Sequence, residues 1–189
     1  MRALALALLV AATPALAAAP SPEASTRKAQ GDARRDAGDN TGALAAYREA
    51  LQASPDYVEA WEEIGKLYFG AKSFREAADA FQHAVDVDAT YANNWFNLAL
   101  SSRRAGELAR ARDAFRRYLG LKPDDADARL RLADVLRALG EREPALREYQ
   151  AVAEAADARK AEPALGERAR AAIGQLRAEG AAPAPVATP

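Results

Sequence analysis

The chain has 189 residues, with 26 lysines and arginines against 27 aspartates and glutamates, one histidine and no cysteine. A net charge of -1 provides no overall attraction to nucleic acid, and the absence of cysteine excludes disulfides, iron-sulfur clusters and zinc-cysteine sites. A single histidine also excludes paired-imidazole metal sites, so we expect one soluble domain with no metal and no cofactor.

The N-terminus has the three parts of a secretory signal peptide. Arg2 is a short basic region, residues 3–12 are uninterruptedly apolar, and small residues follow up to Ala17 and Ala19. We therefore predict that residues 1–17 are a signal peptide, cleaved near Ala17 to Ala19. The alternative is an N-terminal membrane anchor, but the apolar run is shorter than the ~20 residues that a spanning helix needs. The expected location is periplasmic or secreted, with no membrane insertion after cleavage.

Residues 18–23, which follow the signal peptide, are predicted to form a flexible leader. At the other end, residues 180–189 are rich in proline and alanine and poor in bulky side chains, which is typical of a disordered tail.

Between these ends the sequence repeats with a period of 34 residues. The repeated columns contain an alanine, an aromatic residue four positions later, a small residue and a turn residue. These are Ala43, Ala77, Ala111 and Ala145; Tyr47, Phe81, Phe115 and Tyr149; Gly31, Gly65, Ala99 and Ala133; and Gly38, Gly106 and Gly140, with Gly70-Ala71-Lys72 at the turn of the second copy. Apolar residues within a copy recur at helical spacing, so each copy is predicted to be two helices that rely on their neighbours for stability.

These columns resemble the signature of the tetratricopeptide repeat (TPR) family, and the second copy matches it through Trp61, Ile64, Gly65, Tyr68, Ala77, Phe81 and Ala84. The resemblance implies an all-α, right-handed α-solenoid of about four TPR helix-turn-helix units. The predicted copies are 24–57, 58–91, 92–125 and 126–159. An amphipathic segment at 160–179 is expected to cap the stack.

Two departures from the signature matter. The first copy has charged or polar residues at Arg27, Gln30 and Arg34, which suits a water-facing terminal repeat. In the fourth copy Arg129 replaces the signature tryptophan, which puts tight packing there in question.

The resemblance also implies that the leading helix of each copy lines a concave groove. We predict that a partner binds in its later half, where amides, arginines and apolar side chains gather. The predicted groove residues are Lys66, Phe69, Asn93, Phe96, Asn97, Leu100, Arg104 and Arg131. Phe69, Phe96, Leu100 and Leu130 favour binding because intra-repeat packing does not require apolar residues at these positions; the alternative is a solvated helix face.

Catalysis is not expected. Glu62 and Glu63 are adjacent on a helix and so diverge, His83 lies on an outer face, and no histidine neighbours Ser101. The predicted function is a non-catalytic scaffold or assembly factor of the bacterial cell envelope, whose partner is a peptide segment or helix of another envelope protein. Two alternatives are a regulator or accessory subunit of an envelope enzyme such as a cell-wall hydrolase, acting through the convex side, and self-association through the solenoid ends.

Overall fold

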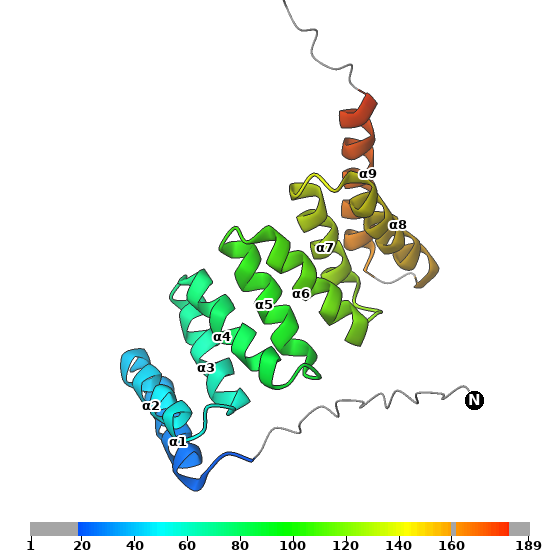
Figure 1. Cartoon of the computed structure of the whole chain (residues 1–189). Helices are drawn as coiled ribbons and strands as arrows, with labels where there is room; N and C mark the ends of the chain where they lie inside the picture. The colour runs from blue at the N-terminus through cyan, green and yellow to red at the C-terminus, as the bar shows by residue number, and fades with distance from the viewer. Residues whose placement is uncertain (1–18, 160–161, 182–189) are drawn as a thin grey trace, which may run out of the picture.

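The computed structural model describes residues 19–159 and 162–181, and within these ranges the chain forms helices and no strands. The helices follow one another in chain order along an extended stack (Figure 1). They are α1 (Pro22–Asp36), α2 (Asn40–Ala53), α3 (Val58–Gly70), α4 (Phe74–Val87), α5 (Ala92–Arg104), α6 (Leu108–Leu121), α7 (Ala126–Ala138), α8 (Arg142–Arg159) and α9 (Pro163–Ala181). The predicted all-α solenoid is confirmed.

The predicted signal peptide and most of the predicted tail lie outside the described residues. The first helix begins at Pro22 rather than at residue 24, because the Ser21 side chain accepts a hydrogen bond from the backbone N–H of Ala24 and caps it. None of the described helices is both long enough and apolar enough to cross a bilayer.

Successive helices pack as pairs, α1 with α2, α3 with α4, α5 with α6 and α7 with α8, and each pair contacts the next. In two pairs a glycine of the first helix lies directly under a ring of the second. A Cβ at Gly65 would lie 2.7 Å from Cζ of Phe81, and Gly31 meets Tyr47 in the same way. The recurring small residue thus allows the two helices of a pair to approach closely.

The turns inside the pairs share one backbone conformation. Gly38, Gly106 and Gly140 have φ between +76° and +82°, in the left-handed region that ends many helices. Lys72 occupies the same place in the second pair with φ +62°, although it carries a side chain. The backbone conformation of this turn therefore repeats in all four copies, even in the copy that has lysine in place of glycine.

The fourth copy keeps a contact that its sequence suggested was lost. The indole N–H groups of Trp61 and Trp95 donate to the carbonyls of Pro55 and Ala89, each at 2.8 Å. Arg129, one period later, donates from Nη2 to the carbonyl of Pro123 at the same distance. Its guanidinium thus ties the start of α7 to the preceding loop, as the tryptophans do in α3 and α5.

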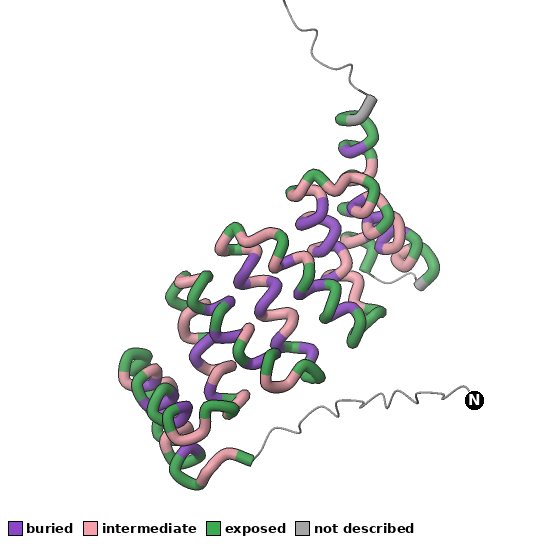
Figure 2. The backbone as a smooth tube through the Cα atoms, in the orientation of Figure 1, coloured by how far each residue is buried: buried purple, intermediate pink, exposed green. Residues whose placement is uncertain are grey.

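Buried positions lie where successive helices meet (Figure 2). They divide into two apolar clusters. The smaller one joins α1, α2 and α3 to Ala80 of α4, and the larger one runs from Ala77 of α4 to Leu176 of α9. Tyr68 of α3 packs against both, so the division falls within the second helix pair.

The last helix covers the end of the stack, in agreement with the predicted cap. Ala169 and Leu176 of α9 are buried against the preceding helices. On the other side, Arg137 of α7 donates to the side chains of Gln175 and Glu179, at 2.9 and 2.6 Å.

Candidate partner-binding groove

The first helices of the pairs, α1, α3, α5 and α7, present the surface that we call the leading-helix face, and the predicted groove residues lie on α3, α5 and α7. One apolar residue assigned to the groove is not there. Leu130 is only 1% exposed and belongs to the larger cluster. Phe69, Phe96 and Leu100 are half-buried and pack against that cluster. These positions therefore contribute to the larger cluster, although packing inside a repeat does not require apolar residues there.

Two of the predicted residues, Arg131 and Phe96, contact each other. The guanidinium carbon of Arg131 lies 6.0 Å from the centroid of this ring, within the range of a cation-π contact. Tyr118 and Phe115 flank the same ring, with centroids 5.1 and 6.0 Å away. Arg131 also donates from Nε to the carboxylate of Asp127 at 2.5 Å. Its side chain is thereby held in place, and its terminal N–H groups can still bind a carboxylate or a carbonyl.

Two asparagines extend this surface along α5. Asn93 is exposed and Asn97 is half-buried. Neither side chain hydrogen-bonds to another residue within the described ranges. Each amide therefore offers a donor and an acceptor to an extended backbone.

Arg104 and Phe69 belong to a different place on the molecule. Both contact Phe74 at the start of α4, which the sequence analysis did not single out. The Phe69 and Phe74 rings are 5.4 Å apart in an edge-to-face arrangement, and the guanidinium carbon of Arg104 lies 5.9 Å from the Phe74 ring. The structure thus divides the predicted residues into separate groups.

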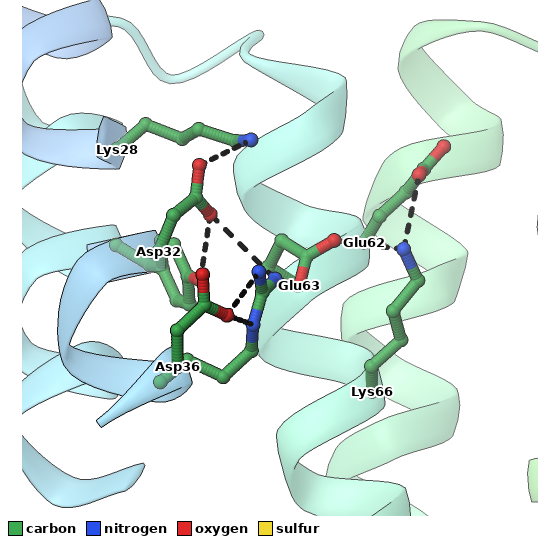
Figure 3. A network of polar contacts seen from close by, with 8 residues as sticks. Lys28, Asp32, Asp36, Glu62, Glu63 and Lys66 are labelled. Carbon is green, nitrogen blue, oxygen red and sulfur yellow. Dashed lines mark hydrogen bonds and ion pairs between the residues drawn. The ribbon is translucent and has the colours of Figure 1, made fainter. Parts of the chain in front are cut away.

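Lys66 is engaged by acidic neighbours on its own helix, at 2.8 Å from Glu63 and 3.8 Å from Glu62 (Figure 3). Glu63 also pairs with Arg35, which comes from α1. Arg35 in turn lies 3.6 Å from the carboxylate of Asp32. Ion pairs therefore connect α1 to α3 on the leading-helix face.

The charges on α1 continue this network. Asp32 accepts hydrogen bonds from Nζ of Lys28 at 2.8 Å and from the hydroxyl of Tyr47 at 2.9 Å. Partial burial alone would raise the pKa of Asp32, but these two hydrogen bonds outweigh it and hold the pKa below its usual value. The early half of the leading-helix face is thus occupied by internal pairs, whereas the half around Phe96 retains free polar groups.

The opposite surface, formed by α2, α4, α6 and α8, is the trailing-helix face, and it carries a series of hollows that follow the same period. The hollows at the second and third copies lie between two successive trailing helices, and those at the first and fourth copies lie between the two helices of one pair; in each, the fourth residue of the copy lines the hollow. Those residues are Arg27, Trp61, Trp95 and Arg129. The hollow at Trp61 measures about 560 Å³ and the one at Trp95 about 620 Å³. These hollows were not predicted from the sequence, although the residues that mark them recur every 34 positions.

The histidine and the serines that could have served catalysis are engaged in packing. His83 stacks on Trp61 with ring centroids 4.3 Å apart. Ser101 and Ser102 are buried in the helix pairs. Within the described ranges no three histidine, aspartate or glutamate side chains come together as a metal site would require.

The chain is similar to several solved structures. It matches a crystal structure of MamA with a TM-score of 0.62 and 26% identity, covering 82% of this chain and 90% of that one. It matches YrrB, described as a TPR protein with an unusual peptide-binding site, with a TM-score of 0.70 and 21% identity over 83% and 77% of the two chains. The first TPR of Spaghetti (RPAP3), bound to an HSP90 peptide, matches with a TM-score of 0.57 and 22% identity over 64% and 95%.

Two curated proteins are also similar in part. They are a BBSome complex member BBS4 homolog of Drosophila melanogaster, 28% identical over 107 residues, and Protein bimA of Emericella nidulans, 25% identical over 88 residues. The matches cover 57% and 47% of this chain but only 22% and 11% of those proteins. This chain therefore corresponds to a small part of each.

Family models described as TPR or tetratricopeptide repeat match residues 31–72, 58–91, 92–135 and 127–156. Together they extend without a gap over most of the helical array. The second of these ranges coincides with the second copy defined by the 34-residue period. The chain belongs to the tetratricopeptide repeat family.

Proposed function

We propose that this protein is a non-catalytic scaffold or assembly factor that holds a peptide segment or helix of another protein on its leading-helix face. Proteins of this family are interaction scaffolds, and two of the similar structures are described in terms of peptide binding. The observation that carries the proposal is the position of Arg131 over Phe96, which lies on the same helix as two asparagines whose amides make no hydrogen bond within residues 19–159 and 162–181. An extended segment would place a carboxylate on Arg131, its backbone on Asn93 and Asn97, and an apolar side chain on Phe96.

A photo-crosslinking amino acid at Asn97, on the leading-helix face, tests this proposal in producing cells. The control carries the same amino acid at Arg147, an exposed residue of α8 on the trailing-helix face. We expect a discrete protein adduct at position 97 that disappears when Arg131→Glu is added, with helical content by circular dichroism unchanged. Equal adducts at both positions, or an adduct that survives Arg131→Glu, would contradict the proposal.

We further propose that the chain is exported across a bacterial inner membrane and that its partner is another protein of the cell envelope. The apolar N-terminal run, preceded by Arg2 and followed by small residues up to Ala17, supports this location. N-terminal sequencing of the protein from a periplasmic fraction tests it. We expect a chain that begins after Ala17 or Ala19, and an intact Met1 in that fraction would refute cleavage.

A further inference from the structure

The hollow at Trp95, between α4 and α6 on the trailing-helix face, combines apolar and cationic walls. Val85 and Ala89 contribute from α4 and its loop, and Leu121 comes from the end of α6. Arg116 and Arg117 form the α6 wall. The hollow thus combines apolar side chains with positive charge along one edge.

Arg117, at the edge of this hollow, differs from the arginines that line the other hollows, because each of those has a side-chain partner. Arg48 in the Trp61 hollow donates a hydrogen bond to the hydroxyl of Tyr68 at 2.5 Å. Arg27 pairs with Glu49 at 3.0 Å, and Arg129 pairs with Glu148 at 2.9 Å. Arg117 makes no ion pair or side-chain hydrogen bond with any residue in the described ranges. An arginine at the rim of an apolar hollow with its donors free is suited to bind a carboxylate from outside.

Arg116 adds to this charge because its own partners hold it loosely. Its guanidinium lies 3.8 Å from Glu141 and 4.0 Å from Asp113, at the outer limit of an ion pair, and its side chain is 49% exposed. The one acid in the lining, Asp86, is on the opposite wall, where it accepts a hydrogen bond from Gln82 at 2.9 Å. An acidic ligand is therefore favoured on the α6 side and disfavoured on the α4 side.

An apolar residue is also exposed here. Leu121 is 43% exposed, and it and Tyr91 are the large hydrophobic residues that the described part of the chain leaves exposed. Leu121 lines the hollow beside Trp95, whose indole N–H is already bonded to Ala89 and whose ring therefore offers only apolar contact.

We propose that the Trp95 hollow binds an acidic peptide segment of a partner protein, one that carries a large apolar side chain between its carboxylates. The apolar side chain lies on Trp95 and Leu121, and the carboxylates bind Arg116 and Arg117. This site is on the opposite face from the groove around Phe96 and goes beyond the function proposed above. One chain could then hold two partner segments at once.

The test measures fluorescence anisotropy of a dye-labelled peptide in which a Leu-Phe pair is flanked by glutamates, titrated with the whole purified protein. We expect saturable binding that Arg117→Glu weakens about tenfold or more, since a charge-assisted contact contributes ~1.5–3 kcal/mol and 1.4 kcal/mol is tenfold. The matched control is Arg147→Glu, which makes the same charge change at an exposed position of α8 and should leave binding unchanged. Leu121→Ser should also weaken binding. All titrations are repeated in Arg131→Glu protein, in which the groove around Phe96 no longer attracts the carboxylates of the peptide, and the losses should persist there.

Three outcomes would overturn the proposal. Equal losses in Arg117→Glu and Arg147→Glu would show unspecific charge attraction, and equal binding of a lysine-flanked Leu-Phe peptide would show unspecific apolar contact. Binding to phosphatidylserine vesicles that depends on Arg117, without binding of the glutamate peptide, would assign the hollow to an anionic lipid surface. Circular dichroism of each variant verifies that the helices are intact.

Discussion

Replacing Asn94 with alanine is expected to stabilise the protein. Asn94 is 1% exposed, and neither its amide nitrogen nor its amide oxygen has a hydrogen-bond partner within the described ranges. The equivalent positions one period away are Ala60 and Ala128, both fully buried, so alanine suits this place in the helix pair. Burying an unsatisfied amide costs about 1–3 kcal/mol, and alanine adds about 0.5 kcal/mol of helix propensity.

Some packing is lost when the amide group is removed, at a cost of about 1 kcal/mol. The net expectation is a free energy of unfolding higher by roughly 0.5–2.5 kcal/mol, or a urea midpoint higher by about 0.25–1.25 M at a slope of about 2 kcal/mol/M. The control is Asn93→Ala, the neighbouring exposed asparagine, which gains helix propensity without removing a buried amide. The reasoning is refuted if Asn94→Ala is no more stable than Asn93→Ala in urea titrations followed by circular dichroism.

Three further outcomes are expected. Lys72→Gly should raise the free energy of unfolding by about 1 kcal/mol in a urea titration, because Lys72 has positive φ where the other copies have glycine; a loss of stability would show that its side chain makes a compensating contact. Arg129→Ala should lower stability by about 1–2 kcal/mol by removing the hydrogen bond to Pro123, and Arg129→Trp should restore it as judged by thermal unfolding; equal losses in both variants would argue against this role. Burial and the hydrogen bond to Asp125 raise the pKa of Tyr118 to about 12. The contribution of Tyr118 to the free energy of unfolding is therefore complete below the unfolded-state pKa of about 10 and is lost as the pH rises through 12. Stability measured by denaturation should therefore fall in this alkaline window, and Tyr118→Phe should flatten that dependence; an unchanged slope would contradict the assignment.

The fold could be predicted from the sequence because the same packing contacts recur in every copy and so impose the same residue types every 34 positions. The alanine, aromatic and small-residue columns belong to the interface inside each helix pair, and Gly65 under Phe81 shows the contact directly. Arg129 shows where residue type alone misled. A guanidinium and an indole differ in most respects, but both carry an N–H group. Only the structure shows that Arg129 and Trp95 use this group to bond equivalent loop carbonyls.

The candidate sites were less predictable because they depend on contacts between copies. Leu130 was assigned to the surface from its place in one helix, yet neighbouring pairs bury it. Arg104 and Arg131 were grouped by charge, whereas the structure places them beside different rings. The Trp95 hollow is a candidate site because Arg117 has no side-chain partner within the described ranges, whereas Arg27 and Arg129 in other hollows are paired with acids.

The division of the apolar interior within the second helix pair has a mechanical consequence. To one side of it, α1 is tied to α3 by ion pairs such as Arg35 with Glu63, and such pairs weaken in salt while apolar contact does not. Bending should therefore concentrate near α3 and α4, where the two apolar clusters meet, and added salt should loosen the connection between α1 and α3.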